Sequence, residues 1–315
     1  MQALVDGLDP AQGQVIIIGD TKSPADFDLP GARFLDIEAQ YATGLSSARL
    51  CPTRHYARKN VGYLLAIRDG AGLIQETDDD NLPIAGFFDP VARAVAVPTV
   101  RQTGWINVYR YFTDGAIWPR GLPLDEIHRP LPAFEALAVE AADCPIQQGL
   151  ANGNPDVDAI FRLIQPRDVT FRSDRRLALA PGAWCPFNSQ NTAWFPDAFP
   201  LLYLPAHCSF RMTDIWRSFV AQRIAWENGW TILFHHATVW QDRNPHNLMR
   251  DFEDEIPGYV NNARIAATLG ALSLTAGPAA MADNLILCYA ALTGLGVVGE
   301  LEIPLLRCWL ADLGL

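Results

Sequence analysis

The sequence has little that would direct it to nucleic acid or to a metal–thiolate site. Its 315 residues carry a formal net charge of −11, and no basic stripe offsets this acidity. That balance excludes nucleic acid as the main partner. The six cysteines contain no CxxC pair, which excludes an ordinary zinc site and a small disulfide framework. We therefore expect reduced thiols and a cytoplasmic location.

Long apolar runs are also missing. The most apolar stretch, residues 285–298, contains polar residues and two glycines and is too short to span a bilayer. The N-terminus lacks a basic region followed by an apolar segment, so we expect no signal peptide. With 50% hydrophobic and 19% charged residues, the chain is typical of a globular protein with a sizeable core. This composition is compatible with peripheral membrane association and leaves the oligomeric state undecided.

Apolar runs and a helical pattern alternate in the first quarter of the chain. Val15–Ile18 and residues 33–37 and 73–77 are predicted strands, and residues 56–69 have apolar side chains at helical spacing before Gly70. Strands and helices joined by short links predict right-handed βαβ units. The expected fold class is therefore α/β, with a mostly parallel, Rossmann-like sheet flanked by helices.

The rest of the chain adds two predicted strands and several helices. Residues 201–205 and 230–234 resemble strands, and residues 213–226 form a predicted amphipathic helix between them. Ala, Leu and Gly dominate from about residue 247, which indicates helices. We expect a catalytic or binding domain over residues 1–245 and a helical C-terminal extension over residues 246–315.

Three consecutive carboxylates, Asp78, Asp79 and Asp80, follow the predicted strand at residues 73–77, and Asn81 comes next. Adjacent carboxylates repel one another and so require a counter-charge. Mg²⁺ or Mn²⁺ would supply it, because both prefer hard oxygen ligands and share their shell with phosphates. In open α/β sheets the carboxyl end of a strand is where ligands bind. The alternative is an acidic surface turn without a ligand.

Two cations and an amide, Arg58, Lys59 and Asn60, lie near the start of the predicted helix at residues 56–69. Helix N-termini favour anions through their free N–H groups and dipole. Beside a metal site, these side chains would form a clamp for a diphosphate. The alternative is a solvated basic turn.

These motifs, in this order, resemble the core of the GT-A glycosyltransferases and, more narrowly, the STELLO-like family of glycosyltransferases. The resemblance extends from about residue 13 to about residue 262. The segments that carry it are Val15-Ile-Ile-Ile-Gly-Asp-Thr-Lys-Ser-Pro24, Arg58-Lys-Asn-Val-Gly-Tyr63, Thr77-Asp-Asp-Asp-Asn81, Asn154-Pro-Asp-Val-Asp-Ala-Ile-Phe-Arg162, Trp184-Cys-Pro-Phe-Asn-Ser-Gln-Asn-Thr192, Phe199-Pro-Leu-Leu-Tyr-Leu-Pro205 and Phe210-Arg-Met-Thr-Asp-Ile-Trp-Arg217.

The resemblance implies a DxD-type motif that binds Mn²⁺ or Mg²⁺ and, through it, a nucleotide sugar. Asp78 and Asp80 would then bind the metal, Asp79 and Asn81 would contact the donor, and UDP-sugars are the first donors to consider. Asp214 matches the position of the catalytic base of inverting members, since an inverting transfer needs a carboxylate to deprotonate the acceptor hydroxyl. Asp214 would alternatively cap its helix.

Two further groups complete the expected site. The resemblance places a histidine that completes the metal site after the strand at residues 230–234, where His235 and His236 stand. Neighbouring residues of a strand point to opposite faces, so at most one of them would reach the metal. The alternative is a pair of ordinary strand-end histidines. Asn188, Gln190 and Asn191 are flanked by aromatic residues and suit sugar binding, because polar groups orient hydroxyls and rings stack on sugars.

The chain departs from the GT-A pattern at its start, where only about fourteen residues precede Val15. A first strand that helps to hold the nucleotide base is therefore expected to be missing. The functional expectation is a metal-dependent glycosyltransferase acting on a glycan or another hydroxyl acceptor. A nucleotide-sugar mutase and a non-catalytic partner protein of a polysaccharide-synthesis complex remain open alternatives, and an aspartate-nucleophile phosphatase is the weakest. The sequence identifies neither the sugar nor the acceptor, nor does it decide between inversion and retention.

Overall fold

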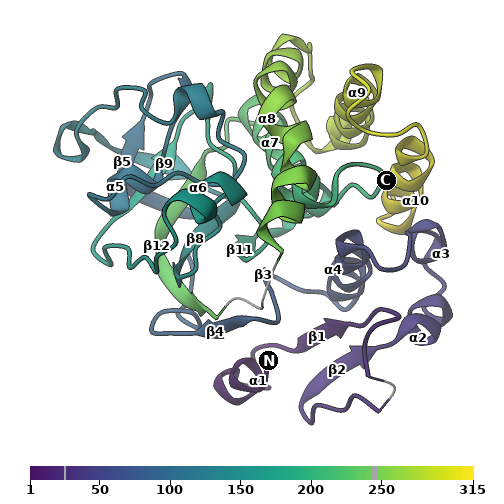
Figure 1. Ribbon diagram of the computed structural model, residues 1–315. Coiled ribbons are helices and arrows are strands. Elements are labelled where there is room, and N and C mark those ends of the chain that lie inside the picture. Colours follow the sequence, from purple (N-terminus) through teal and green to yellow (C-terminus); the bar gives the residue numbers. More distant parts are fainter. Residues whose placement is uncertain (25, 243–246) are drawn as a thin grey trace.

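A computed structural model describes residues 1–24, 26–242 and 247–315, and its centre is a mixed eight-stranded sheet (Figure 1). Seven strands follow one another across the sheet, and the eighth, β4, pairs with β12. In spatial order the strands are β3 (Ile74–Thr77), β11 (Asn191–Trp194), β8 (Ile146–Gly153), β12 (Ile232–Gln241), β9 (Arg176–Leu179), β5 (Ala94–Val100) and β7 (Val139–Asp143), with β4 (Asn81–Pro83) beside β12.

Two smaller parallel pairs accompany this sheet: β1 (Val15–Ile18) with β2 (Ala32–Leu35), and β6 (Gly104–Trp105) with β10 (Ala183–Trp184). The helices are α1 (Gln2–Gly7), α2 (Ile37–Ala42), α3 (Ser46–Leu50), α4 (Lys59–Arg68), α5 (Tyr109–Phe112), α6 (Ala159–Ile164), α7 (Thr213–Glu227), α8 (Leu248–Ala271), α9 (Met281–Gly294) and α10 (Glu302–Asp312). Short 3₁₀ turns are η1 (Tyr56–Arg58), η2 (Leu124–Glu126), η3 (Phe134–Ala136), η4 (Pro196–Leu202), η5 (Phe210–Met212) and η6 (Pro278–Ala280).

The α/β class is confirmed, but the expectation of a mostly parallel sheet is wrong. Within the described residues, only the β8–β12 and β5–β9 pairs of the large sheet are parallel. The first predicted βαβ unit does not form one sheet. Strands β1 and β2 pair with each other, while β3 pairs antiparallel with β11 in the large sheet. A short apolar run shows that a strand is buried and says nothing about the direction of its neighbour.

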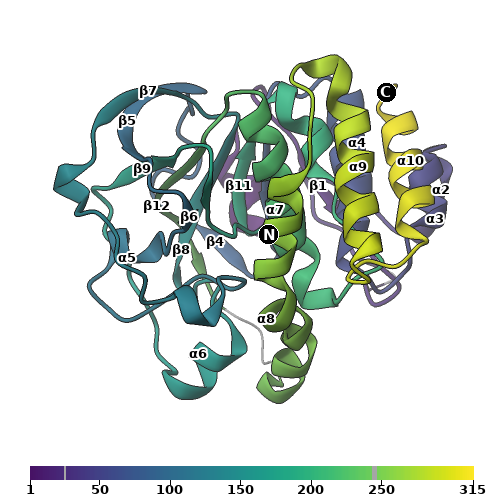
Figure 2. The same cartoon turned by 90° about the horizontal axis from the view of Figure 1, so that it is seen from above.

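Three sequence-based boundaries change for identifiable reasons. Residues 201–205 are not a strand: they overlap the end of η4, which begins at Pro196, where proline fits the first turn. Strand β12 continues past Phe234 to Gln241, because Ala237, Thr238 and Val239 are also buried in the sheet. Helix α7 is buried on nearly every face rather than amphipathic. It lies between the large sheet and the C-terminal helices, so it has no solvent face (Figure 2).

The helical C-terminal part is confirmed as α8, α9 and α10: α8 and α9 pack against α7, and α10 packs against α9 and α3 (Figures 1 and 2). Their apolar side chains belong to the same core as those of the sheet, with Leu269, Tyr289 and Trp309 fully buried. Residue 245, where we divided the chain, lies outside the described residues, so the boundary remains a prediction. Among the described residues, no helix combines the length and the apolar character needed to cross a bilayer.

Asp312 joins the last helix to the N-terminal region. Its carboxylate accepts hydrogen bonds from the backbone N–H groups of Ser46 and Ser47, at 2.9 and 2.8 Å, at the start of α3. We expect Asp312→Ala to lower the free energy of unfolding by about 1 kcal/mol, because the helix loses its capping acceptor. Urea denaturation of this variant and of Glu300→Ala, an exposed acidic residue nearby in sequence, measures the effect. An equal effect of both changes would contradict the capping role.

Candidate functional site

The three aspartates form the turn between β3 and β4. Asn81 fixes this turn: its side-chain amide donates to the carbonyl of Gln190, at 2.9 Å, and to the hydroxyl of Thr77. The Gln190 side-chain amide in turn donates to Oδ1 of Asn81. The turn is therefore tied to the segment before β11, which the sequence placed in the site for a different reason.

The turn lines one side of a pocket of about 250 Å³. Segments that are far apart in the chain supply the other sides, among them the start of α7 with η5, the region of α6 and residues 188–190. The lining residues are Tyr56, Asp78, Asp79, Asp80, Arg120, Asp156, Arg162, Asn188, Gln190, Phe210, Arg211, Asp214 and Gln241. The structure thus brings Asp78, Asp79, Asp80, Asn188, Gln190 and Asp214 together, as the sequence predicts.

Asp78 already has a counter-charge. The Lys59 ammonium lies 2.9 Å from Asp78 Oδ1 and also donates to the carbonyl oxygens of Thr77 and Ser189. Tyr56 donates its hydroxyl to the same carboxylate oxygen at 2.5 Å. Burial, and then the charge of Asp78, raise the pKa of Tyr56 well above its usual value, so its proton stays in place. Lys59 therefore positions Asp78 rather than pointing freely into the pocket.

Asp80 is the carboxylate that lacks compensation. Its Oδ2 accepts a hydrogen bond from the Gln241 side chain at 3.1 Å, while its Oδ1 is buried and has no hydrogen-bond partner among the described residues. Burial, and then repulsion from Asp78, raise the pKa of Asp80 above its usual value. A buried carboxylate oxygen without a donor is costly, which points to a cation at this position when the site is loaded.

Arg120, Asp156 and Asp214 form a buried ion-pair network on the opposite wall. The Arg120 guanidinium donates to both oxygens of Asp156, at 2.7 and 2.9 Å, and to Asp214 Oδ2 at 2.9 Å. Burial acts to lower the pKa of Arg120, but the two carboxylates outweigh it and hold that pKa well above the usual value. Asp214 lies in the first turn of α7, whose N-cap position is occupied by Met212 without a side-chain hydrogen bond. The Asp214 carboxylate accepts hydrogen bonds from Arg120 through both oxygens and lines the pocket.

The donor set fits Mg²⁺ or Mn²⁺ as an ion shared with a ligand. Among the described residues, no cluster of three or more His, Cys, Asp or Glu side chains could hold a metal ion unaided. Mg²⁺, however, is commonly bound by one or two carboxylates together with substrate phosphates. Asp80, with its unpartnered oxygen, and the exposed Asp79 beside it are the carboxylates available for this purpose.

Several predicted ligands do not reach the pocket. Arg58 is buried, and its guanidinium donates to Gln40 Oε1 and to the carbonyls of Ala48 and Cys51, so a phosphate-binding role is not compatible with its placement. Asn60 binds both backbone groups of Leu204. These residues join α4 to its neighbours because each finds a polar partner that the linear sequence does not show.

Asn191 and Asn81 also serve the scaffold. The Asn191 amide donates to the carbonyl of Leu150 and to the hydroxyl of Thr238, so it holds β11 against the neighbouring strands. Neither Asn191 nor Asn81 lines the pocket. Both are almost fully buried, which leaves no surface for a ligand.

His235 and His236 are not placed to ligate the metal with the aspartates. They lie inside β12, which continues to Gln241, and Gln241 is the residue of this strand that meets Asp80. His235 pairs with Gly149 and Arg176 in the adjoining strands. Burial, and then the neighbouring His236, lower the pKa of His235 to about 4. The prediction was wrong because the strand was expected to end at Phe234.

Sequence reasoning missed seven lining residues. Asp156, Arg162, Phe210 and Arg211 stand in segments that carried the family resemblance, so their charge and position in those motifs could have identified them. Arg120 and Tyr56 gave no comparable signal, since their role depends on partners that are distant in sequence. Gln241 was missed with the true end of β12. The seven are Tyr56, Arg120, Asp156, Arg162, Phe210, Arg211 and Gln241.

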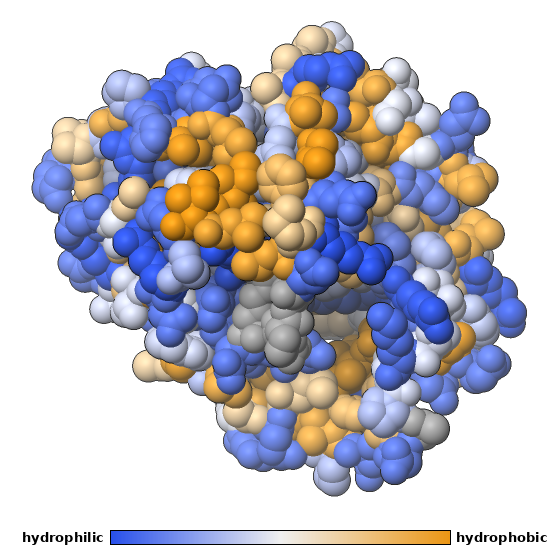
Figure 3. Space-filling view, viewed as in Figure 1, coloured by the Kyte–Doolittle hydropathy of each residue, from blue (hydrophilic) through white to orange (hydrophobic). Residues whose placement is uncertain are grey.

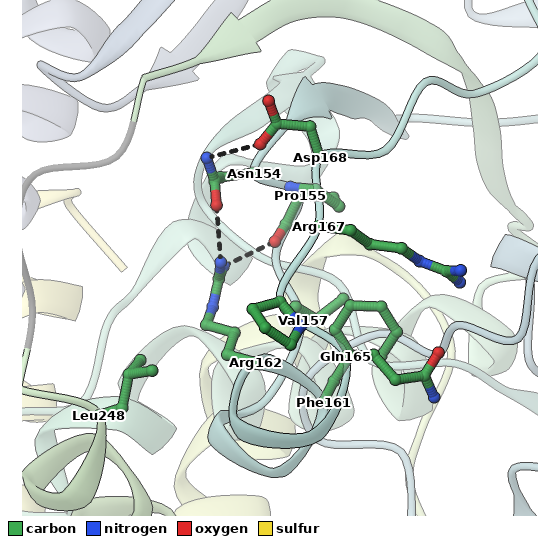
Figure 4. A pocket seen from close by; sticks show the side chains of 10 residues that line it. Asn154, Pro155, Val157, Phe161, Arg162, Gln165, Arg167, Asp168 and Leu248 are labelled. Carbon is green, nitrogen blue, oxygen red and sulfur yellow. Dashed lines mark hydrogen bonds between the residues drawn. The ribbon is translucent and has the colours of Figure 1, made fainter.

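A second pocket of about 410 Å³ adjoins the first, and Arg162 lines both. Figure 4 shows its lining, in which Asn154, Arg162 and Gln165 supply polar groups and Phe161, Val157 and Leu248 supply apolar ones. Arg162 donates to the Asn154 side chain at 3.2 Å and to the carbonyl of Pro155 at 2.7 Å. The two pockets thus share a wall that is held by hydrogen bonds.

Comparison with known proteins agrees with this arrangement. A model of the STELLO glycosyltransferases matches residues 211–314, from η5 to α10. The Arabidopsis thaliana protein named Probable glycosyltransferase STELLO2 is 30% identical over 319 residues, which is 95% of this chain and 41% of that protein. Probable glycosyltransferase STELLO1 of the same plant is 32% identical over 247 residues, or 72% of this chain and 32% of that protein. The chain spans less than half the length of either relative, and over most of its own length it is similar to the STELLO glycosyltransferases.

Proposed function

We propose that this chain is a metal-dependent glycosyltransferase that transfers a sugar from a nucleotide sugar to a hydroxyl acceptor. The observation that carries the proposal is the buried, unpartnered Oδ1 of Asp80 in a pocket rich in carboxylates. Mn²⁺ or Mg²⁺ at Asp80 and Asp79 would neutralise the donor diphosphate. Asp78, held by Lys59 and Tyr56, would orient the donor.

The charge of the pocket supports a cation. Five carboxylates line it against three guanidinium groups, of which Arg120 bridges Asp156 and Asp214 and Arg211 pairs with Glu255. A nucleotide diphosphate would add further negative charge to this surface and would be repelled without a divalent ion. UDP-sugars are the first donors to test, since the likeness to GT-A enzymes is the sole guide to the base.

The proposed transfer uses Asp214 as the base. The acceptor oxygen forms a bond to the anomeric carbon, and the bond between that carbon and the diphosphate oxygen breaks. The electron pair leaves with the nucleoside diphosphate, and the acceptor proton passes to the Asp214 carboxylate in an inverting reaction. Arg120 keeps this carboxylate at the pocket wall through both of its oxygens.

Asp80→Asn tests the proposal through two opposite effects. We expect the metal-free variant to be more stable than the wild type by about 0.5–1 kcal/mol, because a half-buried carboxylate that repels Asp78 is removed while solvent already screens part of that repulsion. We also expect the Mn²⁺-dependent thermal shift with UDP-sugars to disappear. Since the pKa of Asp80 is raised in the folded state, the stability difference should shrink as the pH falls through that pKa.

Asp69→Asn, on the exposed end of α4, is the matched control and should leave the Mn²⁺-dependent shift intact. Titration calorimetry with a panel of UDP- and GDP-sugars would overturn the enzyme proposal if no sugar nucleotide bound in the presence of Mn²⁺. That outcome would favour a non-catalytic partner protein. Isomerisation of the donor without any acceptor would instead identify a mutase.

A further inference from the structure

The surface beside the second pocket carries an unusual density of exposed aliphatic side chains. On α6, Leu163 and Ile164 are exposed, Ile164 to 69%. On α8, Ile256 and Val260 are exposed, Val260 to 64%, and the two helices pack against each other. We call these four residues the α6–α8 patch. Figure 3 shows a continuous hydrophobic area over the position that α6 occupies in Figure 1.

The patch is continuous with the second pocket through α6 itself. Phe161, Arg162 and Gln165 of the α6 region line the pocket, while Leu163 and Ile164 from the same turns face solvent. Residues three and four positions apart lie on the same side of a helix, so Ile164 follows Phe161 along one face. Leu248 lines the pocket at the start of α8, two turns before Ile256. A ligand in the pocket can therefore extend over both helices.

The pocket and the patch have different chemistry. The pocket is lined by the polar or charged side chains of Asn154, Arg162, Gln165, Arg167 and Asp168 next to the proposed reaction site, and a volume of about 410 Å³ suits one polar head group. The patch offers aliphatic carbon and no ionisable group. A purely polar glycan would leave the patch exposed to water, whereas a hydroxyl-bearing group attached to an aliphatic chain would cover it.

We propose that the acceptor is amphipathic: its hydroxyl head group enters the second pocket, and its aliphatic chain lies along the α6–α8 patch. This inference rests on the proposed function, since the pocket is an acceptor site only if the adjoining pocket binds the donor. Arg162 lines both pockets, so a head group in the second pocket adjoins the pocket that contains Asp214 and the aspartate turn. The transfer itself is unchanged, with the head-group oxygen forming the new glycosidic bond.

A pair of probes isolates the chain from the head group. Methyl β-D-glucopyranoside and n-octyl β-D-glucopyranoside, the latter below its micelle-forming concentration, are titrated into the full chain without metal or nucleotide sugar. We expect the octyl compound to bind at least about tenfold more tightly, because each buried methylene adds favourable transfer free energy. Ile164→Ser and Val260→Ser should each remove most of this preference. Both positions are exposed, so neither change should impair folding.

Val139→Ser is the matched control, because Val139 on β7 is exposed to 67% and lies outside the patch. An octyl preference that survives in both patch variants, or that Val139→Ser lowers equally, would overturn the proposal. The proposal is also overturned if the wild-type chain binds the two glucosides equally well but binds phosphatidylcholine vesicles in a way that Ile164→Ser abolishes, since the patch would then be a membrane-contact surface. Asp80→Asn should leave the octyl preference unchanged, so this assay distinguishes a failure of the acceptor proposal from a failure of the donor proposal.

Discussion

Replacing Arg217 by Met is expected to lower the free energy of unfolding by about 3–5 kcal/mol. Arg217 donates through two nitrogens to the two oxygens of Glu76, at 2.8 and 2.9 Å, and both side chains are almost completely buried. Tyr63 and Trp194 also donate to Glu76. Without the guanidinium, a buried carboxylate next to the aspartate turn loses its only ionic partner in the described part of the chain. Guanidinium chloride denaturation at pH 7 measures the loss.

The double variant Glu76→Gln/Arg217→Met separates ion-pair loss from a simple packing defect. We expect it to recover a substantial part of the stability, because no uncompensated buried charge remains. Arg101→Met is the control, since Arg101 forms a salt bridge with Glu140 on the surface and should change stability little. A double variant that is no more stable than Arg217→Met would contradict the ionic role of the pair.

Replacing Arg120 by Met should be comparably damaging, and the damage should depend on pH. Asp156 and Asp214 would both lose their guanidinium partner, with an expected cost of about 3–5 kcal/mol at pH 7. In the wild type, burial acts to raise the pKa of Asp156, but Arg120 outweighs it and the pKa is lowered. A lowered folded-state pKa stabilises the protein above the pKa of the unfolded chain and loses this effect as the pH falls through the folded value.

In Arg120→Met the direction of the pKa shift reverses. Burial without Arg120 raises the pKa of the Asp156 carboxyl, so protonation then favours the folded state. The stability difference between wild type and Arg120→Met should therefore be largest near pH 7 and should narrow toward pH 4–5, within the range where free carboxyl groups begin to protonate. Thermal unfolding at a series of pH values measures this. A difference that stays constant across the series would show that Arg120 acts through packing alone. Glycosyl transfer, once an acceptor is found, should be lost in this variant.

The sequence was most reliable where a short motif and its local structure coincide. The aspartate turn after β3, the helix beginning near Lys59 and the extent of α7 all follow from apolar spacing and helix signals within about fifteen residues, although α7 is buried on nearly every face rather than amphipathic. The six free cysteines and the helical C-terminal part also agree with expectation. Asp214 was placed correctly beside the aspartates because the motif around it carried the family resemblance.

The predictions of site residues were wrong where the partners of polar side chains are distant in the sequence. Arg58 and Lys59 are neighbours in sequence, yet one is buried among carbonyl groups and the other pairs with Asp78. His235 was assigned to the site because β12 was expected to end at Phe234; the strand continues to Gln241, and Gln241 reaches the site instead. The prediction of a mostly parallel sheet was wrong for a similar reason, since the direction of a strand relative to its neighbours depends on segments from elsewhere in the chain.

The sequence by itself determined the α/β class, the resemblance to the STELLO glycosyltransferases and the acidic turn that organises the proposed site. These depend on residue order over short distances, where steric preferences and hydrophobic periodicity act directly. Only the tertiary structure decided that Asp78 is neutralised by Lys59 while Asp80 retains an unpartnered oxygen, and that Arg120 links two buried carboxylates. The physical reason is that the charge balance of a pocket is set by which groups burial brings within about 3–4 Å of one another, and the linear order of residues does not encode those distances.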